Sequence, residues 1–203
     1  AQRAAAEAHV EEVITSSAGR VLDRSQIGEI EYHALLAELP IQQVQSVLTN
    51  GASAIRLLTT DDVMFVSPFT PMSVAPGTLE PVAQTNLARS DRVEGKPRIA
   101  LLDGLPFTNH DTLQGRLSID DPDGLGENYP VAARHHGTAM ASLIIHGDLT
   151  DGGPALDRPL YVRPILQPHE FMPGHEQVVP NRLLPDVLHR AIRRIVKGEG
   201  NQP

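Results

Sequence analysis

Asp103 and His136 have the side-chain types, and the neighbours, that acid–base chemistry requires. Asp103 ends an apolar run that predicts a buried strand over residues 98–103. His136 lies just before a stretch in which Met140, Leu143 and Ile144 recur at helical spacing, so a helix should begin near it. A carboxylate at the end of a strand and an imidazole at the start of the next helix can meet above a parallel sheet, where α/β folds place their chemistry.

The elements that would position these two side chains indicate an α/β fold. From residue 98 onward the pattern predicts a strand, a long loop, a helix, a second strand over 160–166, a loop and a last helix that Pro185 opens. The last helix should bury an apolar stripe and turn its basic residues, Arg194 among them, to solvent. The stripe comprises Val187, Leu188, Ala191, Ile192, Ile195 and Val196. Residues 98–203 are therefore expected to form one domain.

A smaller α+β domain is predicted over residues 1–66. Its expected elements are helices over 1–16 and 40–50 and strands over 27–36, 54–58 and 63–66. Residues 67–97 follow as a linker, because the prolines between positions 68 and 81 exclude a helix and a central strand there.

The flanks of Asp103 and His136 resemble the Asp and His motifs of the subtilisin-like serine peptidases, or subtilases. In that family a hydrophobic strand ends in the catalytic Asp, and His-Gly-Thr opens a helix some thirty residues later; here Asp103 and His136 lie 33 positions apart. Asn109-His110-Asp111-Thr112-Leu113 is similar to the family's segment just after the Asp. Leu160–Leu166 is similar to the strand that follows the His helix.

The resemblance implies a serine endopeptidase with a Ser-His-Asp triad and a polypeptide substrate. His136 would be the general base, and Asp103 would orient it and stabilise the imidazolium. The nucleophilic Ser and the oxyanion-hole Asn are expected beyond these 203 residues, so the chain alone should be inactive and should need the remaining half of the peptidase domain as its partner. Residues 98–203 would form the first half of a three-layer parallel-sheet domain, and residues 1–66 a propeptide-like domain before it.

Some residues depart from the family pattern or admit another interpretation. Gly104 follows Asp103 directly, where the family usually has Ser or Thr and then Gly, so a different shape is expected for this loop. His135 is a second candidate base, although the Gly-Thr after His136 favours His136. Residues 137–141 also resemble the nucleophile motif with Ala in place of Ser, but they lie too close to Asp103 for that alignment. The alternative function is a catalytically inactive subtilase-like module that binds or regulates a partner.

Composition excludes several classes of partner. The net charge is −8 and no Lys/Arg-rich run occurs, so nucleic acid is not expected as a partner. The apolar runs are too short to span a membrane. No cysteine is present, which excludes disulfides and thiolate metal sites but leaves the compartment open. The absence of a visible export signal favours a cytoplasmic location without fixing it.

No cofactor is expected, and two segments have acidic or histidine residues that a metal site could use. The acidic loop Asp120–Gly124 with Glu127 lacks the full spacing of an EF-hand, so calcium is an open alternative to a solvated turn. His175-Glu176 does not form an HExxH motif, because position 173 is Pro. A metal-dependent hydrolase built from the histidines and the acidic loop is thus a third interpretation.

Overall fold

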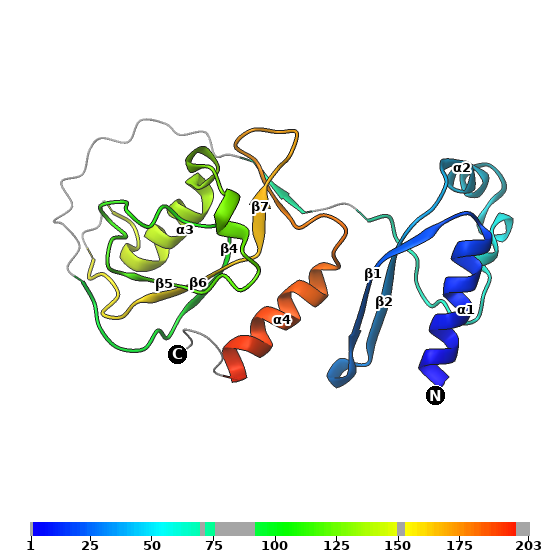
Figure 1. Ribbon diagram of the computed structural model, residues 1–203, viewed down its shortest axis with the longest axis horizontal. Coiled ribbons are helices and arrows are strands. Elements are labelled where there is room, and N and C mark those ends of the chain that lie inside the picture. Colours follow the sequence, from blue (N-terminus) through cyan, green and yellow to red (C-terminus); the bar gives the residue numbers. More distant parts are fainter. Residues whose placement is uncertain (1, 70–71, 76–91, 150–152, 198–203) are drawn as a thin grey trace. The chain divides into compact units, whose positions relative to one another are not determined.

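A computed structural model describes residues 2–69, 72–75, 92–149 and 153–197 (Figure 1). The chain divides into two compact units, one built from residues 1–70 and 181–186 and the other from residues 71–180 and 187–203. Much of the predicted linker, at residues 70–71 and 76–91, lies outside the described residues.

The first unit packs an N-terminal helix against a two-stranded hairpin. The elements are α1 (Gln2–Ser16), β1 (Arg20–Ile27), β2 (Tyr32–Glu38) and α2 (Ile41–Asn50). β1 and β2 pair antiparallel, with a short 3-10 turn between them. Val13 and Ile14 of α1 and Leu57 are the centre of the core. Both predicted helices are therefore present, and the predicted strand over 27–36 is present in its second half.

The strands predicted over 54–58 and 63–66 are wrong. The structure has two 3-10 turns, η2 (Ala52–Ala54) and η3 (Arg56–Leu58), and no strand over 63–66. Ile55 lies between these two turns and Leu57 lies in the second. Both side chains are buried, because they pack into the same core as α1. A short apolar run has the same pattern in a strand and in a buried turn, so the sequence could not separate the two.

The second unit contains a parallel sheet and a small antiparallel sheet. The parallel sheet comprises β4 (Ala100–Asp103), β5 (Leu117–Ile119) and β6 (Leu160–Pro164). β6 lies between β4 and β5 and is parallel to both. The antiparallel sheet comprises β3 (Ser73–Val74), β7 (Leu166–Pro168) and β8 (Glu176–Val178), with β8 central. The helices are α3 (His135–His146) and α4 (Leu184–Lys197). The first three residues of α4, 184–186, belong to the first unit. The expected α/β class is confirmed at this coarse level.

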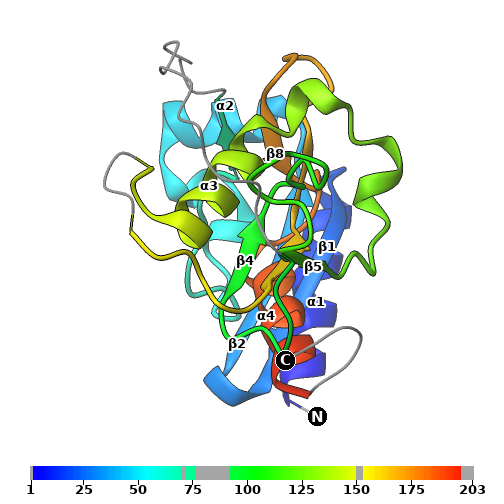
Figure 2. The same cartoon turned by 90° about the vertical axis from the view of Figure 1, so that its left-hand side faces the viewer.

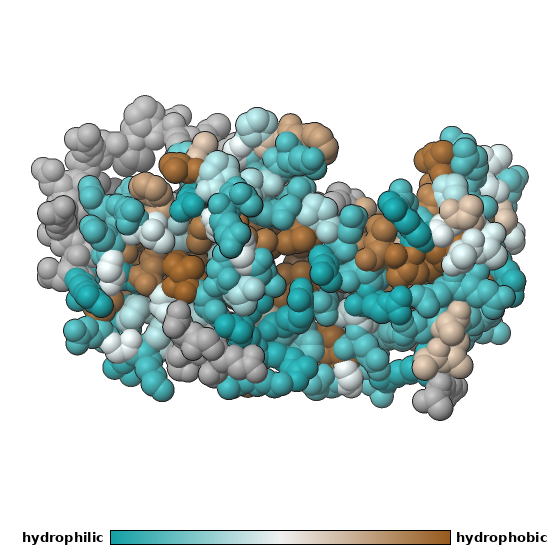
Figure 3. All heavy atoms as spheres, in the orientation of Figure 1, coloured by the Kyte–Doolittle hydropathy of each residue, from teal (hydrophilic) through white to brown (hydrophobic). Residues whose placement is uncertain are grey.

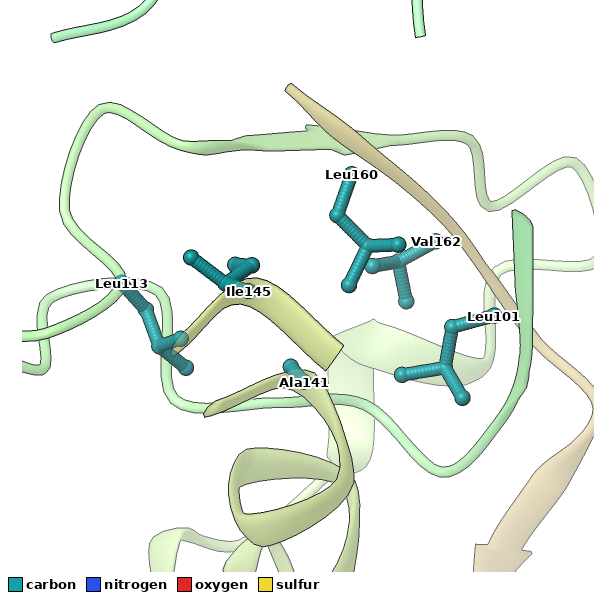
Figure 4. Packing of buried hydrophobic residues seen from close by; sticks show 6 residues of the cluster. All are labelled: Leu101, Leu113, Ala141, Ile145, Leu160 and Val162. Atoms are coloured by element: carbon teal, nitrogen blue, oxygen red, sulfur yellow. The ribbon is translucent and has the colours of Figure 1, made fainter. Parts of the chain in front are cut away.

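Helix α3 covers one face of the parallel sheet, and the core lies between them (Figures 1 and 4). Figure 4 shows Ala141 and Ile145 of α3 facing Leu101, Leu160 and Val162 of the strands. The buried residues of α3 are Gly137, Ala141 and Ile145, whereas Leu143, one of the residues whose spacing predicted the helix, is 57% exposed. The small residues Gly137 and Ala141, at i and i+4, let the helix approach the sheet closely, and Met140 and Ile144 pack at the margin of the same core.

Helix α4 also differs from its predicted stripe. Val187 and Ala191 are buried, but Ile192 and Val196 are exposed. Arg194 was expected to point to solvent and instead forms an ion pair with Asp120.

The face in Figure 3 is mostly hydrophilic, with hydrophobic side chains in smaller groups. No helix in the described part of the chain is long and apolar enough to cross a membrane.

Candidate active site

Asp103 and His136 meet at one edge of the parallel sheet. Asp103 is the last residue of β4, and His136 is the second residue of α3, which lies beside β4 in both views (Figures 1 and 2). The Oδ2 atom of Asp103 is 3.2 Å from Nε2 of His136. The Asp103 side chain is 10% exposed, and the His136 side chain is 32% exposed. The expected approach of the two side chains is confirmed; their catalytic roles stay a prediction.

Gly137 allows β4 and α3 to come this close. A Cβ atom on Gly137 would lie 2.5 Å from the carbonyl oxygen of Gly104 and 2.9 Å from its carbonyl carbon. Those neighbours are backbone atoms, so they could not move aside for a side chain without shifting the strand end. The Gly after His136 therefore has a steric function, which is to seat the first turn of α3 directly on the residue that follows Asp103.

Thr138 fastens the same turn with two hydrogen bonds. Its Oγ1 accepts the Phe107 N–H at 2.8 Å and donates to the Arg134 carbonyl at 2.5 Å. The first bond ties the loop after Asp103 to α3, and the second lies across the start of the helix. Each residue of the His-Gly-Thr segment thus has a structural function. His136 faces Asp103, Gly137 lets the helix contact Gly104, and Thr138 holds the helix start by hydrogen bonds.

The orientation of the His136 ring differs from the triad template. In the template the carboxylate accepts the N–H of Nδ1, which leaves Nε2 for the nucleophile. Here Nε2 faces Asp103, and a neutral ring that donates to this carboxylate would carry its proton there. Nδ1 is then the nitrogen left to accept a proton. His135, the alternative base, is exposed at the first position of α3, and the structure places Asp103 against His136 instead.

A second carboxyl group, which the sequence analysis did not assign to the site, lies against the first. Glu176 of β8 is 1% exposed, and its Oε1 accepts a hydrogen bond from the Tyr129 hydroxyl. Burial, and then the charge of Asp103, raise the pKa of Glu176 to about 7. The sequence offered no signal for this residue, because Glu176 begins the short polar strand Glu176–Val178 and nothing in the sequence indicates which part of the fold that strand meets.

The three aspartates of the acidic loop are bonded to protein groups. Asp120 is buried and forms a bidentate pair with Arg194, which is the main reason that its pKa is held below the ordinary value. Asp121 accepts the backbone N–H groups of Leu125 and Gly126. Asp123 accepts a bond from Arg163. Among the described residues no group of three or more His, Asp or Glu side chains is arranged to hold a metal ion.

Comparisons of the chain with protein-family models, with curated proteins and with solved structures found no match.

Proposed function

We propose that this chain supplies the acid–base pair of a subtilisin-like serine endopeptidase, with His136 as the general base and Asp103 as the residue that orients it. The single observation that carries the proposal is the 3.2 Å approach of Asp103 Oδ2 to the His136 ring, at the end of a parallel strand and the start of the following helix. The resemblance of the two motifs implies this approach of the two side chains, although the ring nitrogen that faces Asp103 differs from the triad template.

The proposed chemistry is peptide-bond hydrolysis through an acyl-enzyme. A serine hydroxyl is a weak nucleophile at neutral pH, so a base must remove its proton as it attacks the scissile carbonyl. His136 would take that proton and later give it to the leaving amine, and the Asp103 carboxylate would stabilise the imidazolium between the two steps. The partly exposed His136 ring is open to substrate, whereas the buried Asp103 is shielded from water.

The proposal makes two demands. The nucleophilic Ser and the oxyanion-hole donor must come from outside these 203 residues, in the remaining half of a subtilase-like domain. The nucleophile must also meet the ring nitrogen that does not face Asp103. That nitrogen is Nδ1 in the present ring orientation, and a rotation of the side chain about its Cα–Cβ bond would be needed to offer Nε2 instead.

The test is hydrolysis of an unstructured protein substrate by the complete gene product that contains these residues. His136→Ala should lower kcat on the order of a millionfold, because triad residues act as a unit. Asp103→Asn should lower kcat by about ten-thousandfold, since the base remains but is poorly oriented.

His135→Ala is the matched control, because it removes a neighbouring imidazole that is exposed on the same helix. It should leave kcat within a fewfold of the parent protein. Equal activity of His136→Ala and the parent would refute the proposed mechanism. A complete protein that binds unfolded polypeptide but never cleaves it would favour the inactive binding module.

A further inference from the structure

The triad chemistry gives no function to Glu176, although its carboxyl group lies against Gly104, the residue that follows Asp103. Glu176 is on the central strand of the antiparallel sheet, between Val74 and Pro168. Its side chain is almost completely buried, and the Tyr129 hydroxyl is its hydrogen-bond partner. In the described part of the chain, no cationic side chain lies within ion-pair distance of it. Burial without a cation favours the protonated form of a carboxyl group.

Gly104 makes room for this carboxyl group. A Cβ atom on Gly104 would lie 1.8 Å from Oε1 of Glu176 and 2.7 Å from the Tyr129 hydroxyl oxygen. Both groups therefore occupy the space where any other residue would have its side chain. This gives a physical reason for the glycine that directly follows Asp103, which is the position where the sequence departs from the family pattern.

The same glycine connects Glu176 to Asp103. The Gly104 N–H donates to Oδ1 of Asp103 at 2.7 Å, while Oδ2 of Asp103 faces His136. Glu176 thus packs on the residue whose N–H fixes the Asp103 carboxylate. The titratable groups recorded against Glu176 are Asp103 at the end of β4 and Tyr129 in the loop before α3. Their interaction is reciprocal, because a charge on either carboxyl group disfavours a charge on the other.

We propose that Glu176 is a positioning residue for the Asp103–His136 pair, holding the Asp103–Gly104 turn in place as a neutral carboxyl bonded to Tyr129. When Glu176 ionises, its negative charge repels that of Asp103. The Asp103–Gly104 turn, and with it the His136 ring that Asp103 orients, should then shift. The inference about position rests on the contacts alone; its consequence for catalysis rests on the proposed function.

The test is a pH titration by NMR of the 203-residue chain, which needs no activity. The side-chain carboxyl carbon of Glu176 should titrate near pH 7, because burial and Asp103 raise its pKa to about that value. In Asp103→Asn the midpoint should fall, since the repelling charge is gone. The ring signals of His136 should show an inflection at the pH where Glu176 ionises, and Glu176→Gln should abolish that inflection.

Glu170→Gln is the control, because it neutralises an exposed carboxylate in the same segment. It should leave the His136 titration curve unchanged. Identical His136 curves for Glu176→Gln and the parent would overturn the proposal and leave Glu176 a structural residue. If Glu176→Gln does not fold, the parent protein still decides: a Glu176 carboxyl that titrates near its ordinary value of 4.5 would also overturn it. Failure to cleave peptides, with the NMR results as expected, would refute only the proposed peptidase function.

Discussion

At the scale of single residues, the Asp103 carboxylate divides its two oxygens between two partners. Oδ1 accepts the Gly104 N–H, and Oδ2 faces the His136 ring. Because one oxygen is fixed by the backbone, the other has little freedom to turn away from the imidazole. In the proposed function, this is how Asp103 would orient the base. The arrangement depends on the turn after β4, and Glu176 packs against that turn.

The protonation of Glu176 should make stability depend on pH. Its pKa is raised from 4.5 to about 7 in the folded chain, so its contribution to the free energy of unfolding is fully present below pH 4.5 and is lost as the pH rises through 7. The shift corresponds to a loss on the order of 3 kcal/mol. Glu176→Gln cannot ionise and keeps an acceptor for Tyr129, so it should lose much less.

Urea unfolding at pH 5 and pH 8 measures this difference. The stability of Glu176→Gln relative to the parent should rise between the two pH values, whereas the curves of Glu170→Gln and the parent should stay parallel. A pH-independent difference between Glu176→Gln and the parent would contradict the raised pKa.

At the scale of elements, the position of α3 decides whether the site exists. The helix presents Gly137, Ala141 and Ile145 to the sheet, and this sets its rotation about its own axis. That rotation brings the ring of His136 to Asp103. The Thr138 hydroxyl then ties the helix start to the loop at Phe107. Packing on one side of the helix and a hydrogen bond at its end therefore fix the backbone position from which the imidazole reaches Asp103.

Gly137→Ala should weaken this contact. The new Cβ atom would meet the backbone of Gly104 at 2.5 Å, so either the helix start or the strand end must move. We expect a loss of about 1–3 kcal/mol in the free energy of unfolding from overpacking. The better helix propensity of Ala, worth about 1 kcal/mol, should offset only part of it. Urea unfolding measures the net change, and the His136 ring signals should shift with it.

Gly153→Ala is the matched control, since nothing lies within 4 Å of its added Cβ atom. Its stability should stay within a few tenths of a kcal/mol of the parent. If Gly137→Ala is as stable as Gly153→Ala and leaves the His136 signals in place, the close contact of α3 with Gly104 is not needed.

At the scale of the whole molecule, the first unit is completed by a segment far along the chain. Residues 181–186 belong to it together with residues 1–70. Asp23 of β1 is buried, and its carboxylate accepts the Leu183 N–H at 2.8 Å and pairs with Arg182 at 3.3 Å. Without this segment the buried carboxylate would lose both partners, which is costly for a charged group.

Limited proteolysis should show that residues 181–186 belong to the first unit. Trypsin should cut first between residues 67 and 96, where Arg89 and Arg92 lie in the proline-rich segment. The two fragments should separate on a denaturing gel but elute together in size-exclusion chromatography, because residues 181–186 complete the first unit.

Asp23→Asn should increase the fraction of nicked protein that dissociates, whereas Asp61→Asn, at an exposed position, should not. First cleavage inside residues 99–166 would argue against the two units.

The sequence by itself determined the elements whose signals are local. A run of apolar residues predicted the strand that ends at Asp103, and helical spacing predicted the helix that begins at His135 and ends before Gly147. The two motifs therefore located the candidate pair, because a strand end and the next helix start fall at the same edge of a parallel sheet. Short apolar runs such as 54–58 and 63–66 were beyond this reasoning, since periodicity does not separate a strand from a buried turn.

Only the tertiary structure decided which groups share the site. Glu176 and Tyr129 join Asp103 through different strands and loops, and no local pattern relates the three positions. Likewise, the buried face of α3 follows from the sheet that it meets, and the pairing of Arg194 with Asp120 follows from the packing of α4. The physical reason is the same in each case: side-chain direction and burial depend on contacts between segments distant in sequence, and chain folding brings those segments together only after local structure is specified.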